Sequence, residues 1–179
     1  MRTLSFLLGL SMLVSCSHES DNVDNEVIIG DSSSNYVIIK PDPAISITAS
    51  HSDSLDLNSD GIFEIRFSIS PINTVTGIGS KTEITTRNKL QILLSGMNLP
   101  DTLSIKSVLT RDSIWSGIDP FTILLQSYAC YSYFHCVGWG NFRNISGKYI
   151  GYKLGEKFGW ILVDSSTSEL KIREYTVLR

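Results

Sequence analysis

The sequence predicts an all-β protein, an antiparallel β-sandwich of jelly-roll-like or Ig-like type with little helix. From Tyr36 onward, apolar and polar residues alternate with a period of two, which is the pattern of half-buried strands. These short runs are separated by frequent Gly, Pro, Asn and Asp residues, as in two antiparallel sheets packed face to face. No window of eleven or more residues shows helical periodicity.

The N-terminus reads as a signal peptide over residues 1–15. Arg2 supplies a positive charge, and residues 4–13 form an apolar stretch too short to span a bilayer. Leu13-Val14-Ser15-Cys16 resembles a bacterial lipobox, which implies cleavage before Cys16 and lipidation of that residue. Several acyl chains on one residue would anchor the protein stably in the outer membrane. The alternative is an ordinary signal peptide followed by a chance cysteine.

Residues 16–35 are expected to be the lipidated cysteine and a polar tether, followed by a single β-sandwich domain over residues 36–179. Residues 17–35 are mostly polar and lack the apolar content needed to order themselves. His18, Glu19 and Asp21 resemble export signals of surface-exposed lipoproteins in one Gram-negative phylum. The expected location is therefore the periplasmic or the cell-surface side of the outer membrane. No run after residue 15 is long and apolar enough for a transmembrane helix.

The expected strands can be placed in order along the domain. Residues 90–95 are nearly all apolar, which predicts a central strand, whereas residues 102–110 read either as a strand or as a long connection. The other expected strands cover residues 36–40, 44–49, 63–69, 82–87, 121–127, 131–137, 148–154, 157–163 and 170–177. In the strand over 63–69, one face would carry Phe63, Ile65, Phe67 and Ile69, and the other Glu64, Arg66 and Ser68.

An acidic loop precedes that strand and matches the start of a calcium-binding loop. Hard cations such as Ca²⁺ prefer oxygen ligands, which alternating acidic and amide side chains around a tight turn at Gly61 provide. Phe67 stands where an EF-hand has its bidentate Glu, so any Ca²⁺ here would be structural, with further ligands from elsewhere. The alternative is a plain β-hairpin turn. The candidate ligands are Asp56, Asn58, Asp60, Ile62 through its carbonyl, and Glu64.

The C-terminal part carries a recurring order of short motifs. These are Tyr149-Ile150-Gly151-Tyr152-Lys153, Phe158-Gly159-Trp160-Ile161-Leu162-Val163 and Ile172-Arg173-Glu174-Tyr175. Together with the acidic loop, they resemble a group of bacterial lipoproteins and exported proteins of unknown function. The resemblance implies a β-sandwich and an extracytoplasmic address, and it supplies no catalytic residues.

The residues themselves predict local features of this C-terminal part. Gly155-Glu156 reads as a hairpin turn, and Gly151 and Gly159 as points of close backbone approach. Trp160 reads as a core aromatic side chain rather than a ligand platform.

Cys130 and Cys136 would be the remaining cysteine pair after lipidation of Cys16. Exported proteins can keep disulfides. On one straight strand their Cα atoms would lie roughly 20 Å apart, far beyond the limit of about 7 Å for a disulfide. A disulfide, which we expect, therefore requires the chain to bend near Ser132-Tyr133 and conflicts with a continuous strand over residues 131–137.

Other chemistry is sparse. A net charge of −3 without basic clusters argues against nucleic acid as a partner. His135 and Cys136 are adjacent, so on a strand they would point to opposite faces and form no dyad. Ser54, Thr102 and Ser113 each follow an Asp and precede an apolar residue, which resembles an O-glycosylation motif of exported proteins; Asp-Ser is also turn chemistry.

These observations favour a non-enzymatic, lipid-anchored envelope or surface component that binds glycan or another envelope protein. The alternative is a glycan-active enzyme on a lectin-like sandwich. Two carboxyl groups roughly 5–10 Å apart beside exposed Trp or Tyr would favour the enzyme. An exposed aromatic row from Tyr128, Tyr131 and Tyr133 without such a pair would favour binding.

Overall fold

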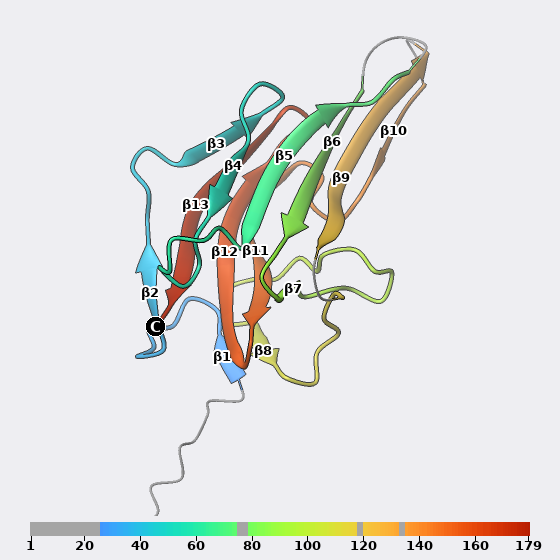
Figure 1. Ribbon diagram of the computed structural model, residues 1–179. Coiled ribbons are helices and arrows are strands. Elements are labelled where there is room, and N and C mark those ends of the chain that lie inside the picture. Colours follow the sequence, from blue (N-terminus) through green and yellow to red (C-terminus); the bar gives the residue numbers. More distant parts are fainter. Residues whose placement is uncertain (1–25, 75–78, 118–119, 133–134) are drawn as a thin grey trace, which may run out of the picture.

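The computed structural model describes residues 26–74, 79–117, 120–132 and 135–179 (Figure 1). Within these residues the protein is all-β without helix, and every strand pairing is antiparallel, which confirms the predicted fold class. Figure 1 shows two larger twisted sheets lying one over the other, as in a β-sandwich. No helix in the described part of the chain has the length and apolar character to cross a membrane.

The first large sheet has five strands in the order β10-β9-β6-β5-β4. Sequential strands β4, β5 and β6 form a meander, and β9 joins β6 after the chain has visited the other sheet. The strands are β4 (Asp53–Leu55), β5 (Ile65–Pro71), β6 (Gly79–Thr86), β9 (Phe121–Ser132) and β10 (His135–Trp139).

The second large sheet has six strands. Its order is β2-β13-β12-β11-β7, and β3 pairs with the first half of β13 while β2 pairs with the second half. The strands are β2 (Tyr36–Ile39), β3 (Ile45–Thr48), β7 (Leu90–Ile92), β11 (Ile145–Leu154), β12 (Lys157–Ser165) and β13 (Glu169–Leu178). Gly155, at a positive φ of 64°, lies in the two-residue turn between β11 and β12, as predicted.

A small two-stranded sheet closes one end of the molecule. It pairs β1 (Glu26–Ile28) with β8 (Val108–Thr110), and Val27, Ile29 and Leu109 are buried. The first described strand, β1, therefore lies within the segment that the sequence suggested as a polar tether. The short apolar run at Val27-Ile28-Ile29 supplies the buried surface that the rest of that segment lacks.

The core lies between the two large sheets. Ile65, Phe67 and Ile69 of β5 are buried on one face, as their period of two predicts. Trp160 of β12 is fully buried and meets the rings of Tyr36 and Tyr149 edge-on at centroid distances of 6.5 and 5.3 Å. The prediction that Trp160 is a core residue is therefore confirmed.

Gly159 and Tyr152 form a close contact inside the six-stranded sheet. A Cβ atom on Gly159 would lie 2.3 Å from Tyr152 Cζ, so the ring occupies the space that any side chain would need. The Tyr152 hydroxyl donates to the Thr176 carbonyl oxygen at 2.6 Å and lies 3.0 Å from Thr176 Oγ1. Thr176 Oγ1 also accepts a hydrogen bond from the Trp160 amide at 2.9 Å. The predicted close approach at Gly159 is confirmed, with Tyr152 as the ring that uses it.

The apolar run over residues 90–95 is not a central strand. Only Leu90–Ile92 forms a strand, β7, and it lies at an edge of the six-stranded sheet. The connection that follows covers this edge: Leu93 bridges to Trp115, and Leu94 bridges to Pro100. The run is buried because a loop packs over it. Residues 102–110 are mostly this connection and end in β8.

The chain reverses between β9 and β10, so residues 131–137 are not one strand. Cys130 and Cys136 are direct cross-strand partners, and their sulfur atoms lie at disulfide-bonding distance, 2.07 Å. Of the two residues named for the bend, Ser132 ends β9, and Tyr133 lies outside the described residues. The expected disulfide and the bend it requires are both present.

Candidate metal centre

The connection between β4 and β5 is a compact loop closed by its own carboxylates. Asp56 accepts hydrogen bonds from the amides of Asn58 at 3.2 Å and Gly61 at 2.8 Å. Asp60 accepts from the Ile62 amide at 2.8 Å and from Asn58 Nδ2 at 2.9 Å. Gly61 has a φ of 84°, which L-residues rarely adopt, so glycine suits this turn. These hydrogen bonds fix the positions of the Asp56 and Asp60 carboxylates within the loop.

Glu64 does not point where the period of two placed it. Glu64 is 1% exposed and Phe63 is 57% exposed, the reverse of the predicted faces. The reason is that β5 begins only at Ile65. Before it, the Glu64 amide donates to the Leu55 carbonyl at 3.1 Å, and the Glu64 carbonyl accepts from the Arg87 amide at 2.8 Å. The backbone is held there outside regular strand geometry, with the Glu64 side chain turned inward.

The buried Glu64 carboxylate has a hydrogen bond on only one oxygen. Oε2 accepts from the Leu57 amide at 2.7 Å. Oε1 is buried and has no hydrogen-bond partner in the described part of the chain. A buried carboxylate oxygen left without a donor is energetically costly.

Three carboxylates converge at this point. One oxygen from each of Asp56, Asp60 and Glu64 lies within 4.8 Å of the others. Calcium binds oxygens at about 2.3–2.6 Å, so ligands around one ion lie up to roughly twice that distance apart. The spacing therefore fits a single hard cation. The structure brings together these three of the five predicted ligands.

The two remaining predicted ligands lie in the same loop. The Asn58 side-chain oxygen accepts from the Asp60 amide at 3.1 Å and retains a second lone pair. Ile62, whose side chain is exposed, follows the turn at Gly61 and offers only its carbonyl.

Electrostatics in the loop oppose a charged Glu64. Burial raises the pKa of the Glu64 carboxyl, the Leu57 amide lowers it, and the negative charges of Asp60 and Asp56 raise it further, for a net increase. A bound cation would reverse this balance by neutralising the cluster. The loop is therefore arranged unfavourably for three bare carboxylates and favourably for carboxylates around a cation.

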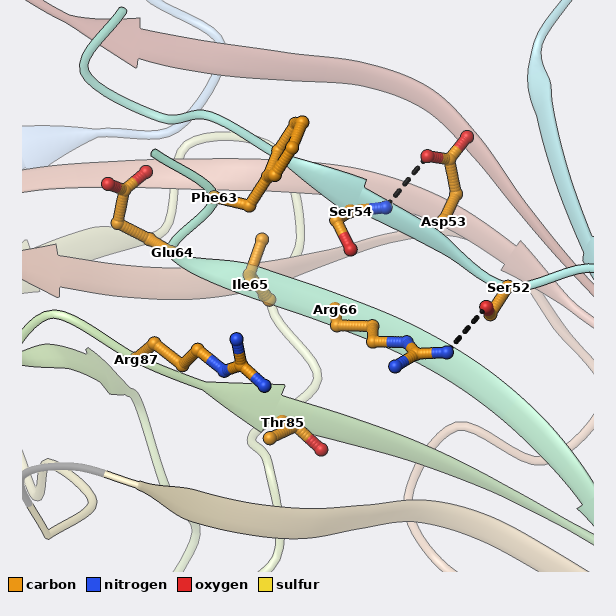
Figure 2. Close-up of a pocket in the computed structure, with 9 residues that line it drawn as sticks. All are labelled: Ser52, Asp53, Ser54, Phe63, Glu64, Ile65, Arg66, Thr85 and Arg87. Atoms are coloured by element: carbon orange, nitrogen blue, oxygen red, sulfur yellow. Dashed lines mark hydrogen bonds between the residues drawn. The ribbon is translucent and has the colours of Figure 1, made fainter. Parts of the chain in front are cut away.

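Next to the loop lies an open cavity that the sequence did not predict. It is lined by Phe63, Arg66 and Arg87, together with polar residues of β4 and β6 (Figure 2). Figure 2 shows the Glu64 carboxylate turned away from the two arginines. One feature of the sequence pointed toward this cavity, namely the outward position predicted for Arg66 on its strand. Arg87 lies beyond the end of β6, and only strand pairing brings it to the same place.

The other predicted site residues lie apart from this loop or at its border. Cys16 lies outside the described residues. Ser54 lies on β4, and its amide donates to Asp53 at 2.7 Å; Thr102 lies in the long connection after β7. Ser113 closes a turn with Thr110, their hydroxyl oxygens 3.0 Å apart. All three are half-buried.

The structure describes two of the three tyrosines of the proposed aromatic row, Tyr128 and Tyr131. Tyr128 is half-buried and Tyr131 is exposed. They are three residues apart on β9, and the pairing of β9 with β10 is irregular at Tyr131, because Ser132 pairs with His135 and Cys130 with Cys136. Tyr133 lies outside the described residues.

Comparison of the chain with protein-family models, with curated proteins and with solved structures found no match in any of the three. The basis for a function is therefore the geometry of the loop and the cavity, together with the sequence features.

Proposed function

We propose that this protein is an exported, lipid-anchored envelope component that binds other molecules without catalysis, and that its loop over residues 56–64 holds a structural calcium ion. The observation that carries the metal assignment is the buried Oε1 atom of Glu64, which lacks a hydrogen bond in the described residues and belongs to a cluster with Asp56 and Asp60.

A cation is the partner that this arrangement lacks. The amides of the loop already donate to Asp56, to Asp60 and to one oxygen of Glu64. A donor for Glu64 Oε1 would satisfy one atom but would leave three negative charges together. A divalent cation would provide a partner for Glu64 Oε1 and would also offset the negative charges. Calcium suits the site better than magnesium because it accepts irregular sets of oxygens, whereas magnesium requires near-octahedral geometry and retains several waters.

The carboxylates are arranged for holding an ion rather than for acid–base catalysis. A glycan-active enzyme needs two carboxyl groups facing each other across a groove that the sugar enters. Here one oxygen from each of the three groups lies within 4.8 Å of the others, and Glu64 is 1% exposed, so the three groups do not face each other across a groove. This geometry favours the binding reading over the enzymatic alternative.

The position of the loop explains why the ion would be structural. Glu64 immediately precedes β5, and its carboxylate binds the Leu57 amide just after β4. An ion shared by Glu64, Asp56 and Asp60 would therefore fasten the β4–β5 connection to the sheet. Lipid anchoring through Cys16 is supported by the lipobox motif and the apolar stretch before it.

Thermal unfolding of the full-length protein in mild detergent tests the metal site. We expect EDTA to lower the Tm and calcium to restore it; at a free concentration of 100 times Kd, binding adds about 2.7 kcal/mol. Asp60→Ala and Glu64→Gln should abolish the calcium response, whereas Glu156→Gln, an exposed acid in the β11–β12 turn, should keep it. A Tm that ignores both EDTA and calcium, with no metal found by mass spectrometry, would leave a plain hairpin turn.

Lipid anchoring is tested separately by metabolic labelling with an alkyne fatty acid. The wild-type protein should incorporate the label and partition into detergent, and Cys16→Ser should do neither. Labelling that persists in Cys16→Ser would contradict the proposal.

A further inference from the structure

We infer that the cavity beside the loop is a binding site for an acidic glycan, with Arg66 and Arg87 holding a carboxylate or sulfate group and Phe63 contacting the sugar ring. This inference names a ligand for the proposed binding component and rests on that role. It does not require the calcium ion.

The cavity has the size of a ligand site. Its volume is about 370 Å³, within the range of roughly 300–1,000 Å³ typical of small-ligand pockets. It opens beside β4, β5 and β6, and Figure 2 shows the side chains that line it. The lining residues are Ser52, Asp53, Ser54, Phe63, Glu64, Ile65, Arg66, Thr85 and Arg87.

Strand pairing gathers the polar residues on the outer face of the sheet. Arg66 is the direct cross-strand partner of both Ser54 and Thr85, so all three point to the same face. This face is opposite to the buried one that carries Ile65 and Phe67. Figure 2 shows the Arg66 and Arg87 side chains together with Thr85 on this face.

The two arginines have no carboxylate partner. Arg66 donates to Ser52 Oγ at 2.9 Å, and neither Arg66 nor Arg87 forms an ion pair in the part of the chain that the structure describes. Of the carboxylates in the lining, Asp53 accepts from the Ser54 amide and lies 4.0 Å from His51 Nε2, and Glu64 accepts from the Leu57 amide through one oxygen. Many of the other basic residues do form ion pairs, namely Lys40, Lys81, Lys106, Arg111, Lys171 and Arg173.

Two guanidinium groups without an ion-pair partner among the described residues line one cavity and offer it two positive charges. Guanidinium forms paired hydrogen bonds with planar carboxylates and with sulfate or phosphate oxygens. The Ser52 hydroxyl holds Arg66 in place, which lowers the conformational cost of binding. The charge and geometry therefore favour an oxyanion.

Phe63 identifies the rest of the ligand. Its ring is 57% exposed at the edge of the cavity, although a large apolar side chain gains free energy when it is covered. An inorganic anion would leave this ring in water. The apolar face of a sugar ring covers an aromatic ring while its hydroxyl groups reach Ser52, Ser54 and Thr85. A sugar that carries a carboxylate or sulfate therefore matches the two arginines, the Phe63 ring and the hydroxyl groups of the cavity.

Isothermal titration of the full-length protein with defined glycans tests this inference. The probes are an oligogalacturonate, a sulfated chondroitin oligosaccharide, neutral maltohexaose and inorganic sulfate. We expect one or both acidic glycans to bind, and binding to weaken as NaCl is raised. Arg66→Gln with Arg87→Gln should weaken it at least about tenfold, because charge-assisted hydrogen bonds are lost. Phe63→Ala should weaken it severalfold.

The matched control is Arg111→Gln with Arg143→Gln, which removes the same charge from exposed residues outside the cavity and should leave the affinity unchanged. Binding of only the uronate or only the sulfated chain would support the inference and assign the oxyanion. Equal binding of maltohexaose, binding of sulfate alone, equal weakening in the control, or no binding would each overturn it. Calcium-dependent Tm and Cys16 labelling would be unaffected by that failure, so the two proposals fail separately.

Discussion

Tyr152 and Glu64 are two buried polar side chains that the fold treats differently. The Tyr152 hydroxyl meets both oxygens of Thr176, and the same threonine also accepts the Trp160 amide. Glu64 has a donor for one oxygen and two acidic neighbours around the other. At the Tyr152 hydroxyl, the chain supplies the hydrogen-bond partners. At Glu64 the described residues supply a partner for one oxygen only, and we expect a cation from solution at the other.

The comparison extends to protonation. Burial raises the pKa of the Tyr152 phenol well above its usual value, with the Thr176 hydrogen bond opposing part of that effect. Tyr152 is neutral at any ordinary pH, so its burial carries no charge. Burial also raises the pKa of Glu64, but a carboxyl group starts from a usual pKa of about 4.3, so the Glu64 side chain can gain or lose a proton in the range in which proteins are studied. Of these two sites, the Glu64 site is therefore the one that we expect to respond to pH and cations.

Gly159→Ala should give the largest effect, because the Tyr152 site is filled completely. The new Cβ would lie 2.3 Å from Tyr152 Cζ and 2.5 Å from Thr176 Oγ1. Overpacking of this kind costs typically about 1–3 kcal/mol and sometimes more, and here the free energy of unfolding should fall by about 3 kcal/mol or the chain should not fold. Urea unfolding measures it. Gly96→Ala, where no atom lies within 4 Å, should be close to neutral.

Tyr152→Phe should cost less, because it removes one hydroxyl and leaves the packing intact. Thr176 would lose a donor to its buried carbonyl, which lowers the free energy of unfolding by about 1–2 kcal/mol. Tyr131→Phe, at an exposed position, is the control and should change it by under about 0.5 kcal/mol. Equal effects of the two substitutions would show that the Tyr152 hydrogen bonds do not stabilise the fold.

When metal is absent, Glu64→Gln should raise the free energy of unfolding, whereas Tyr152→Phe should lower it. The amide retains an oxygen for the Leu57 N–H and removes the charge that Asp56 and Asp60 oppose. In EDTA, the free energy of unfolding should rise by about 1 kcal/mol. In excess calcium the order should invert, because only the wild type gains from binding. A variant less stable than wild type in EDTA would contradict our account of the cluster.

The smallest effect is the pH dependence of Glu64 in EDTA. Its pKa is raised in the folded protein, so the protonated form stabilises the fold. That contribution is fully present below the usual carboxyl pKa of about 4.3 and is lost as the pH rises through the folded value. The stability difference between Glu64→Gln and wild type should therefore widen from pH 4 to pH 7.

Asp164 is the opposite case, because its pKa is lowered in the folded protein. Its burial would raise the pKa, but hydrogen bonds from Ser146 and the Gly147 amide, together with the charge of Arg173, lower it overall. Its stabilising contribution is present above about pH 3.9 and is lost as the pH falls through the lowered folded value. Asp164→Asn should thus differ from wild type at neutral pH and converge with it in acid. If the stability differences of Glu64→Gln and Asp164→Asn from wild type changed in the same direction with pH, the two carboxylates would not have opposite pKa shifts.

Local pattern predicted the parts of this fold that depend on neighbouring residues in the chain. The period of two placed Ile65, Phe67 and Ile69 in the core correctly, and Gly159 signalled a tight contact. The same rule failed at Glu64, because the Leu55 and Arg87 backbones impose a different geometry just before the strand. The acidic loop was found from its spacing, whereas its unpartnered oxygen depends on packing that no motif encodes.

The features that the sequence did not predict are non-local. Residues 90–95 read as a central strand because burial by a covering loop and burial inside a sheet leave the same apolar pattern. The cavity was missed because Arg66 and Arg87 lie on different segments, and only the pairing of β5 with β6 brings them together. The pattern of residues shows which side chains are buried, and pairing decides what they meet.

The free edges of both large sheets are short. β4 and β7 have 3 residues each, β2 and β3 have 4 each, and β10 has 5. Long unpaired edges act as templates on which strands of other molecules add and aggregate. A protein anchored to a membrane by lipid, as proposed here, shares that surface with its own copies. The edge strands are short, β7 is covered by a loop, and β10 is linked to β9 through the Cys130–Cys136 disulfide. Other copies of the protein therefore find little unpaired strand backbone to pair with.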